Sequence, residues 1–355
     1  MPYPLRLETR VSSSERTCRF VCANASHEPV TADIVMMPFA VAANALLRPA
    51  SMTPVSFAAT AVVELVLEPP TIQAPRAHAL LSYRRESASA LENMAALADA
   101  VTASEFEELV RLPPESFASK RRNDVAIFIQ SACHRDQSQR HRLFRALAQH
   151  VPVAYYGGMH RYAGVYGRKK YRSCEAGRRA LPPLPRAQPP PGGRLLLAAL
   201  SRVESALYKA KLYNLAQVRF FFAFENSMCR DYHTEKIFHA LLVGCVPVYL
   251  GAPSIVRLFP RRAFINVADF ASVAELGAHL RAVAENASAY ESYLRWRSEP
   301  EAIERFRRLF ARSKSDATLR LDDRLCRRLL ALEPTGVEYS VATECTALNE
   351  SFWRE

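Results

Sequence analysis

The residues best suited to chemistry lie in one short stretch of the chain, between positions 225 and 236. They are Glu225, Asn226, Tyr232, Glu235 and Lys236. An aromatic ring can stack on a base, a carboxylate can accept hydrogen bonds from sugar hydroxyls, and an ammonium group can bind phosphate. This set of groups beside the start of a helix predicts a nucleotide-binding site.

The flanking sequence predicts a strand, helix and strand that would position these side chains. Residues 219–225 and 246–250 are apolar runs of strand length. Between them apolar residues recur at helical spacing, with Asp231 or Thr234 able to cap the first turn and Gly244 able to end the helix. Ligands of such units bind outside the carboxyl ends of the strands, so we expect the polar residues to meet there.

Within residues 220–253, the segments AFENS, DYHTEK and GCVPVYLGAP resemble the donor-binding segment of the α1,3/4-fucosyltransferases. Members of this family transfer L-fucose from GDP-fucose to a sugar hydroxyl with inversion. The run through residue 255 and the YLRW at 293–296 are closer to the plant-type enzymes that act on N-glycan cores or Lewis antennae. The resemblance implies an α/β fold of the GT-B type, with two facing Rossmann-like, doubly wound domains.

The resemblance also implies roles for the donor-site residues. Arg140 and Lys236 would bind the diphosphate, and a guanidinium group can hold two phosphate oxygens at once. Further implied contacts come from residues that would position the nucleoside and fucose or flank the phosphates: Asn226, Tyr232, Glu235, Glu225 and Ser131. From the residues alone, Arg140 could equally be one of several solvated arginines on a basic helix.

Glu68 is the candidate general base. The LEPP segment at 67–70 is similar to the family's Glu-Ser-Pro at the end of a strand. An inverting transfer needs a carboxylate that takes the proton from the attacking hydroxyl. The alternative is a surface glutamate before a double-proline turn.

The whole-chain composition is that of a folded globular protein, with 355 residues, 49% hydrophobic and 23% charged. The net charge of +12 favours anionic partners, whether nucleotide phosphates, nucleic acid or acidic membranes. Of the eight cysteines only Cys18 and Cys22 lie close together, with no second pair following them to complete a zinc site, and no Asp-x-Asp occurs. The family resemblance implies GDP-fucose as donor substrate, and without a metal-diphosphate motif we expect no cofactor and no required divalent metal.

The order of predicted elements suggests two domains and a tail. Residues 1–118 are expected to form an acceptor-binding α/β domain, residues 119–335 a GDP-fucose-binding domain with closing helices, and residues 336–355 a tail. Residues 102–122 are expected to be an exposed linker, and residues 161–194 a mobile loop. The strands predicted for the first domain are 19–22, 34–37, 62–67 and 79–83, and the helices are 40–47 and 88–101. In the second domain regular alternation of strands and helices predicts a parallel sheet.

The N-terminal sequence shows no signal-peptide core and no run of about 20 apolar residues. The resemblance implies the Golgi lumen, with membrane attachment only through an anchor absent from this chain, and a glycan or glycoprotein acceptor. Two alternatives stay open. One is a silent homologue that binds nucleotide or glycan without turnover. The other is a nucleic-acid-binding protein that stacks bases on the aromatic run 220–224, although consecutive aromatics favour a buried strand.

Overall fold

The computed structural model describes the parts of the chain from which the fold can be built. These are residues 6–12, 17–23, 30–38, 57–66, 79–82, 89–90, 101–121, 123–130, 136–157, 182, 184, 191–203, 206–317 and 345–353. The chain forms two compact units. Unit 1 contains residues 1–93, 229–232 and 315–345, and unit 2 contains residues 94–228, 233–314 and 346–355.

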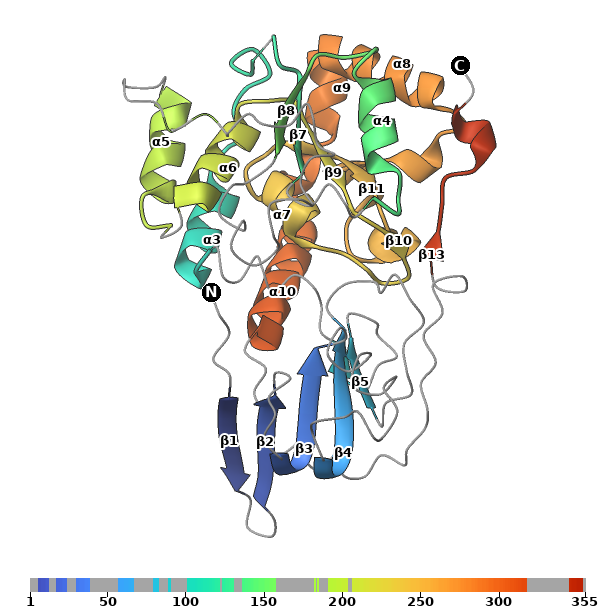
Figure 1. Cartoon of the computed structure of the whole chain (residues 1–355). Coiled ribbons are helices and arrows are strands. Elements are labelled where there is room, and N and C mark those ends of the chain that lie inside the picture. Colours follow the sequence, from blue (N-terminus) through green and yellow to red (C-terminus); the bar gives the residue numbers. More distant parts are fainter. Residues whose placement is uncertain are drawn as a thin grey trace. The chain divides into compact units, whose positions relative to one another are not determined.

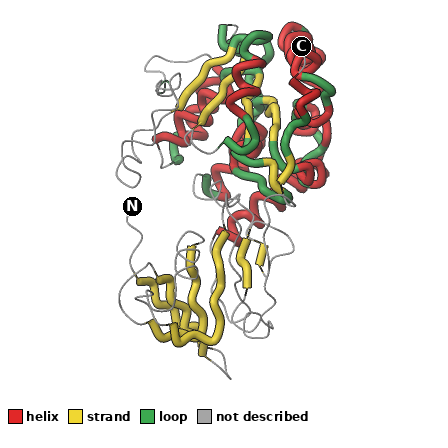
Figure 2. Tube along the Cα trace, turned by 45° about the vertical axis from the view of Figure 1, so that its right-hand side comes forward, coloured by secondary structure: helices red, strands yellow, loops and turns green. Residues whose placement is uncertain are grey.

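Unit 1 contains a six-stranded sheet whose strands follow the chain order (Figures 1 and 2). Its strands are β1 (Arg6–Ser12), β2 (Thr17–Ala23), β3 (Val30–Pro38), β4 (Phe57–Val66), β5 (Ala79–Ser82) and β6 (Ser89–Ala90). The first pair is antiparallel and the other pairs are parallel. The four strands predicted for this part of the chain coincide with β2 to β5.

Two features of unit 1 differ from the prediction. β1 was not predicted, although Arg6, Glu8 and Arg10 alternate with Leu7, Thr9 and Val11, a pattern typical of a strand with one polar face. β6 lies inside the helix predicted over residues 88–101, and that prediction is wrong at Ser89 and Ala90. These two residues pair with Leu81 and Ser82 of β5, so sheet pairing overrides the local helical pattern.

Unit 2 is built on a five-stranded sheet in which all pairs are parallel. The order across the sheet is β12 (Ile265–Asn266), β11 (Val246–Leu250), β9 (Phe220–Phe224), β7 (Ala126–Gln130) and β8 (Val153–Gly157). The predicted α/β alternation and parallel sheet are confirmed. Both units therefore contain a largely parallel sheet, as expected for the fold class.

The central strand β9 shows why this sheet forms. All five of its residues are at most 1% exposed, and it lies between β7 and β11. A continuous apolar run is typical of a parallel strand that is covered on both faces. Since the aromatic rings of β9 are buried, they do not form a base-stacking surface.

Helices cover both faces of this sheet (Figure 1). One apolar core joins the sheet to α4 (Arg140–Leu147), α8 (Val273–Glu285) and α9 (Ala287–Ser292). The other core joins it to α3 (Ala103–Arg111), α5 (Pro191–Leu200), α6 (Ala206–Ala216), α7 (Glu235–Leu242) and α10 (Pro300–Ala317). The mobile loop predicted over residues 161–194 is thus wrong at its last four residues, 191–194, which belong to α5.

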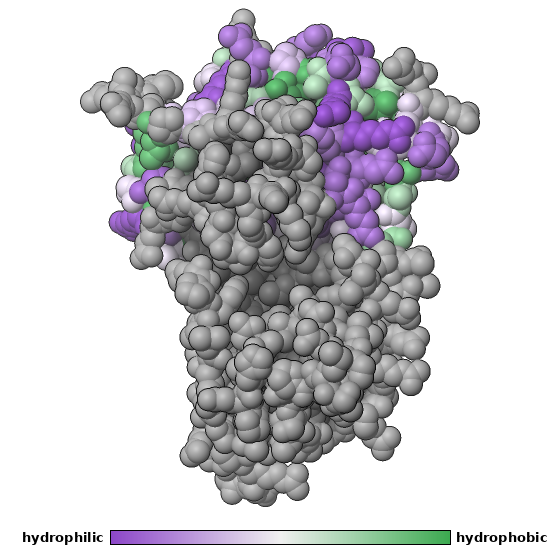
Figure 3. All heavy atoms as spheres, in the orientation of Figure 1, coloured by the Kyte–Doolittle hydropathy of each residue, from purple (hydrophilic) through white to green (hydrophobic). Residues whose placement is uncertain are grey.

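Short elements complete the described chain. These are the strands β10 (Met228–Cys229) and β13 (Cys345–Thr346), which pair with each other, and the 3-10 helices η4 (Pro253–Arg257), η5 (Arg261–Ala263), η6 (Val267–Asp269), η7 (Arg295–Ser298) and η8 (Glu350–Trp353). A disulfide joins Cys229 to Cys345 across 116 residues. Hydrophilic side chains gather on much of the described surface in Figure 3.

The linker predicted over residues 102–122 is wrong, because this segment packs into unit 2. Thr102 and Glu105 form a reciprocal capping box that starts α3. Phe106 stacks on Phe310 of α10 with ring centroids 4.2 Å apart. The first division between the units falls between residues 93 and 94, whereas the sequence suggested a boundary between residues 118 and 119. The assignment of the acceptor to one domain and of GDP-fucose to the other stays a prediction.

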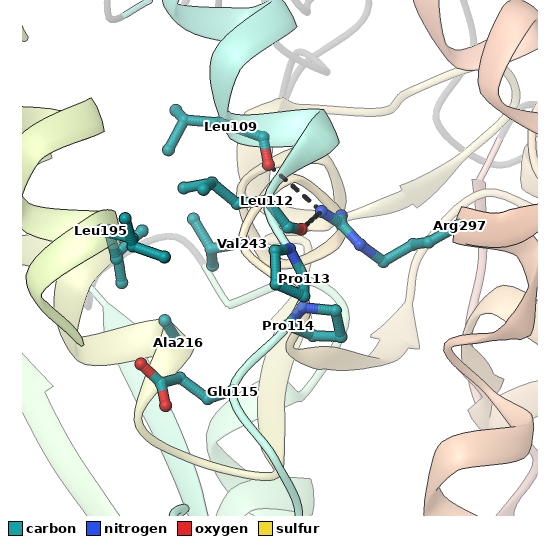
Figure 4. A pocket seen from close by; sticks show the side chains of 10 residues that line it. Leu109, Leu112, Pro113, Pro114, Glu115, Leu195, Ala216, Val243 and Arg297 are labelled. Carbon is teal, nitrogen blue, oxygen red and sulfur yellow. Dashed lines mark hydrogen bonds between the residues drawn. The ribbon is translucent and has the colours of Figure 1, made fainter. Parts of the chain in front are cut away.

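Two cations, the buried Lys120 and the partly buried Arg297, donate to carbonyls at or just beyond the C-terminal ends of α6, α7 and α3. The ammonium group of Lys120, which is 2% exposed, donates to the carbonyls of Ala216, Val218 and Gly244 at 2.7, 3.1 and 3.2 Å. The guanidinium group of Arg297 joins the last turns of α3 and α7 (Figure 4). Its acceptors are the carbonyls of Leu109, Val110, Leu112, Leu241 and Leu242. Both cations satisfy carbonyls that a helix end leaves without intrahelical partners.

The space beside Arg297 is too small for a ligand. Figure 4 shows apolar side chains from α3, α5 and α6 around it, together with Val243, the residue after α7, and its volume is about 30 Å³. This is about the volume of one water molecule in the liquid. The cavity therefore belongs to the packing of unit 2.

Candidate nucleotide-binding site

The site is centred on Glu225, the residue that follows β9. Its amide donates to the carbonyl of Leu250 at 2.8 Å, which extends the pairing with β11 by one residue. Its carboxylate is fully buried and accepts from the Thr234 amide at 2.9 Å and the Thr234 hydroxyl at 2.8 Å. Thr234 precedes α7, so a carboxylate from the neighbouring strand satisfies an amide at the start of this helix.

Lys236 completes this cluster. Its ammonium group lies 2.7 Å from a carboxylate oxygen of Glu225 and 2.7 Å from the hydroxyl oxygen of Thr234. The Lys236 side chain is 17% exposed, while the Glu225 side chain is 0% exposed. The partly exposed amine is therefore the member of the pair that can reach a ligand, and the buried carboxylate holds it in place.

Thr234 occupies the predicted N-cap position of α7, but its side chain does not make the expected capping hydrogen bond. The hydroxyl is used instead by Glu225 and Lys236. At the other end Gly244 has φ +67, in the left-handed region, and follows the last turn as predicted.

A second acid–base pair lies at the start of α7, between Lys211 and Glu235. Lys211 of α6 approaches Glu235 at 3.5 Å. Burial by itself would raise the pKa of Glu235, but Lys236 and Lys211 outweigh it and hold that pKa well below its ordinary value. Glu235 is therefore ionised at neutral pH and available as an acceptor of hydrogen bonds.

His239 lies beneath this pair and is fully buried. Its ring meets the ring of Tyr208 edge-on, with centroids 5.5 Å apart, and neither ring nitrogen has a hydrogen-bond partner among the described residues. Burial, with Lys211 nearby, lowers the pKa of His239 well below its ordinary value. The imidazole is thus neutral and packs as part of the core.

Arg140 lies at the same end of the sheet as Glu225. It begins α4, is 3% exposed, and one of its terminal nitrogens lies 3.4 Å from the carbonyl of Phe224. Asp136 lies 3.8 Å from its Nε atom. The alternative of a solvated arginine is therefore wrong for Arg140, although it holds for the neighbouring Arg142, whose side chain is 49% exposed.

The loop before α4 is tied to this position by Ser138, which sequence analysis missed. The Ser138 hydroxyl donates to the carbonyl of Glu225 at 2.6 Å, and its amide donates to the carbonyl of Asn226 at 3.0 Å. Asn226 is 8% exposed. These contacts bring Arg140, Glu225, Asn226 and Lys236 to the carboxyl edge of the unit 2 sheet, where ligands of such folds bind.

A further hydrogen-bonded chain runs behind the site. His233 contacts the hydroxyl of Tyr249 and the hydroxyl of Ser254, each at 3.1 Å. Burial and the nearby Glu225 raise the pKa of Tyr249 well above its ordinary value, so the phenol stays protonated. A Cβ atom at Gly251 would collide with this phenol and lie 2.9 Å from Glu225 Cγ, so only glycine fits between them.

Three predicted residues need separate mention. Tyr232 is 2% exposed, and its amide donates to the carbonyl of Cys229; both belong to the segment 229–232 of unit 1. Glu68 and Ser131 lie outside the described residues. Within the described ranges, no group of three or more histidine, cysteine, aspartate or glutamate side chains is placed to hold a metal ion.

The relation of this segment to known proteins follows from comparison of the sequence with family models. Residues 201–345 match the model of glycosyltransferase family 10 (fucosyltransferase) C-term. The resemblance predicted from residues 220–253 is thereby confirmed. The match contains the cluster of Glu225, Thr234 and Lys236 and the Lys211–Glu235 pair.

Individual relatives match over shorter stretches. The chain is 41% identical over 98 residues to GDP-fucose protein O-fucosyltransferase 3 of Gallus gallus, covering 27% of this chain and 21% of the relative. It is 44% identical over 89 residues to alpha-(1,3)-fucosyltransferase 4 of Bos taurus, covering 24% and 22%. The match therefore spans only about a fifth of the length of these relatives.

Among solved structures, a crystal structure of an alpha1,3-fucosyltransferase with GDP-fucose aligns with a TM-score of 0.46 and 15% sequence identity. The alignment covers 84% of this chain and 80% of that one. No helix among the described residues has the length and apolar character needed to cross a membrane.

Proposed function

We propose that this protein is an inverting α1,3-fucosyltransferase that transfers L-fucose from GDP-fucose to a GlcNAc-type hydroxyl of a glycan. The observation that carries the proposal is the contact of Lys236 with buried Glu225, in a segment that matches a fucosyltransferase family model. Arg140, which lies outside that segment, reaches the carbonyl of Phe224, the residue before Glu225. Both cations lie at the carboxyl edge of the sheet, where a helix start adds positive potential.

The proposed donor contacts follow from what each side chain can offer. Arg140 and Lys236 would bind the diphosphate and offset the charge that grows as GDP leaves. Glu235, ionised and partly exposed, would accept from sugar hydroxyls, while Asn226 and Tyr232 would orient the nucleoside and fucose. Ser131 would add a phosphate contact. Glu225, being fully buried, would act through Lys236 by holding its ammonium group.

Calorimetry with GDP tests the donor site directly. The Arg140→Lys variant keeps the charge but loses the planar two-point geometry, so we expect weaker GDP binding by about tenfold. Arg142→Lys, at a solvated position on the same helix, is the matched control. Equal GDP affinity in the two variants would remove Arg140 from the site.

Glu68 is proposed as the general base, in an acceptor-binding domain formed by residues 1–118, with the donor domain formed by residues 119–335. The variant Glu68→Gln should abolish transfer and leave GDP affinity unchanged. Retained transfer would dismiss Glu68 as the base, while loss of both properties would point to a folding defect. A wild-type protein that binds GDP but never transfers fucose would be the silent homologue.

The donor is proposed to react without a divalent metal, since fixed cations can stabilise the leaving diphosphate. Transfer should then continue at its full rate in EDTA. Complete loss of activity that manganese restores would contradict this proposal.

A protein hydroxyl is the second candidate acceptor. The first relatives matched are named GDP-fucose protein O-fucosyltransferase 3, and others are named alpha-(1,3)-fucosyltransferase 4. GDP-fucose should be offered with lactosamine, core chitobiose and GlcNAc-terminated glycans in one series, and with folded and unfolded glycan-free protein domains in another. The preferred series decides the acceptor class. On the same family resemblance we propose residence in the Golgi lumen, which immunofluorescence of the tagged full-length protein would test.

A further inference from the structure

A second cavity lies in unit 2 beside the edge strand β12. Its volume is about 230 Å³, and it is formed by residues around β12 together with side chains from α8 and the end of α9. It is lined by Arg262, Phe264, Ile265, Asn266, Asp269, Phe270, His279, Ser292 and Tyr293. None of these residues belongs to the nucleotide site described above.

The apolar part of this cavity is aromatic and held in place by its neighbours. Phe270 contacts the ring of His279 with centroids 5.1 Å apart. His279 in turn lies 2.8 Å from the hydroxyl of Tyr293 through its Nε2 atom. Phe264 is 2% exposed and meets Tyr249 edge-on at 6.1 Å. These contacts fix aromatic walls that can receive a ring-shaped, partly apolar ligand.

The polar part carries groups of both signs. Arg262 and Asp269 both line the cavity and are exposed, and Asp269 interacts electrostatically with Tyr293. The side-chain oxygen Oδ1 of Asn266 accepts from the backbone amide of Ala268 at 3.4 Å, which leaves the side-chain NH₂ group of Asn266 as a donor. A cation, a carboxylate and an amide donor suit a ligand that is neutral overall and has several hydroxyl groups.

The size of the cavity narrows the class of ligand. Pockets for drug-sized molecules have volumes of roughly 300–1,000 Å³. A cavity of about 230 Å³ is smaller and suits a single six-membered ring with its substituents. A sugar ring has an apolar C–H face for the aromatic walls and hydroxyls at its rim for the polar groups.

We propose that this cavity binds one pyranose ring of a glycan. The aromatic rings of Phe270 and Tyr293 would contact the C–H face, and Asp269 and Asn266 would hydrogen-bond the hydroxyls. The site is separate from the donor cluster, with Phe264 and Tyr249 between the two. The proposal does not rest on fucosyl transfer, because a nucleotide-binding protein without turnover could use the same cavity to hold a glycan.

Saturation-transfer NMR and calorimetry on the full chain, with methyl β-N-acetylglucosaminide and methyl α-L-fucoside as probes, test this site. At least one glycoside should bind, and Asp269→Asn and Phe270→Ala should each weaken its binding at least tenfold. Glu285→Gln, an exposed carboxylate-to-amide change at the end of α8, should leave binding unchanged. The thermal unfolding midpoint of each variant checks that the protein remains folded.

Three results would overturn the proposal. The first is that neither glycoside binds the wild-type chain. The second is equal glycoside affinity in wild type, Asp269→Asn and Phe270→Ala. The third is preferential binding of free phenylalanine, whose ammonium and carboxylate groups could meet Asp269 and Arg262 and would mark an amino-acid site. GDP affinity, measured on the same samples, reports separately on the proposed donor site.

Discussion

The two ends of α7 are held by cations that have different partners. At the C-terminal end, the buried Lys120 and the partly buried Arg297 donate to backbone carbonyls. At the N-terminal end, Lys236 pairs with the buried carboxylate of Glu225 and keeps 17% of its side chain exposed. A buried cation that loses its carbonyl partners costs free energy, because its charge is then unpaired in the protein interior. A partly exposed ammonium group can instead bind an anionic ligand in addition to its existing partners. The comparison distinguishes the two ends of α7 by the partners of their cations, which are backbone carbonyls at one end and a buried carboxylate at the other.

The largest expected effect is on stability, from Arg297→Met. This change leaves five helix-end carbonyls without their cation and should lower the free energy of unfolding by about 3–5 kcal/mol. Urea unfolding followed by tryptophan fluorescence measures it, since Trp296 is adjacent in sequence. Arg308→Met, where the side chain is 79% exposed, is the control and should change stability by less than about 0.5 kcal/mol. Similar stability in both variants would end the distinction between the two ends of α7.

At the opposite end of the helix, Lys236→Met should lower GDP affinity, and it should also lower stability because the buried Glu225 carboxylate keeps its Thr234 hydrogen bonds but loses its cation. We expect GDP affinity to fall between about tenfold and a hundredfold, because a charge-assisted contact to phosphate is lost. Calorimetry on the full chain measures this affinity. Lys209→Met is the control, since among the described residues the Lys209 amine donates to the exposed carbonyl of Ser201. If both variants bind GDP equally well, Lys236 does not contact the nucleotide.

The pH dependence of stability sharpens the account of the C-terminal end. Burial lowers the pKa of Lys120 to about 8, from 10.5 in the unfolded chain. Between these values the unfolded chain binds more protons, so a rise in pH favours the folded state by up to roughly 3 kcal/mol. Below about pH 8 both states are protonated, and this contribution becomes constant. Unfolding free energies from pH 7 to 10.5 should rise in wild type relative to Lys120→Met; parallel curves would contradict the shift.

The smallest expected effect is on the rate at which the thiol of Cys245 is alkylated. Cys245 is buried next to Gly244, and burial raises the pKa of its thiol to about 12. At pH 8 the thiolate fraction is therefore negligible, and alkylation should occur only after unfolding. Mass spectrometry of the peptide that contains Cys245, after timed iodoacetamide treatment, measures this rate. Lys120→Met should accelerate it if the C-terminal end of α7 loosens, and an unchanged rate would show that Lys120 does not hold that end closed.

The sequence predicts the strands of unit 2 well because each is a short, uniformly apolar run. It fails where burial depends on distant partners. Lys120 follows two prolines and precedes two arginines, which suggests an exposed segment, yet carbonyls from residues 216, 218 and 244 surround its amine. The composition around Lys120 cannot predict contacts with residues that are about 100 positions away in the sequence.

The same limit applies to the candidate site. Glu225, Asn226 and Lys236 could be predicted because they are close together in the sequence and carry a recognisable pattern. Ser138 and Lys211 could not, because they reach the site from the loop before α4 and from α6 only after the chain folds. Arg140 was ambiguous for a related reason, since charge patterning does not distinguish the one buried arginine on a basic helix from its exposed neighbours.

The Cys229–Cys345 bond closes a covalent ring that includes α7, the edge strand β12 and α10. A protease that cuts the chain once inside this ring would produce two fragments that still migrate as one species on a gel without reductant. Reduction would separate them. Comparison of the two gels would therefore reveal, from very little material, whether the bond is formed in the protein isolated from cells.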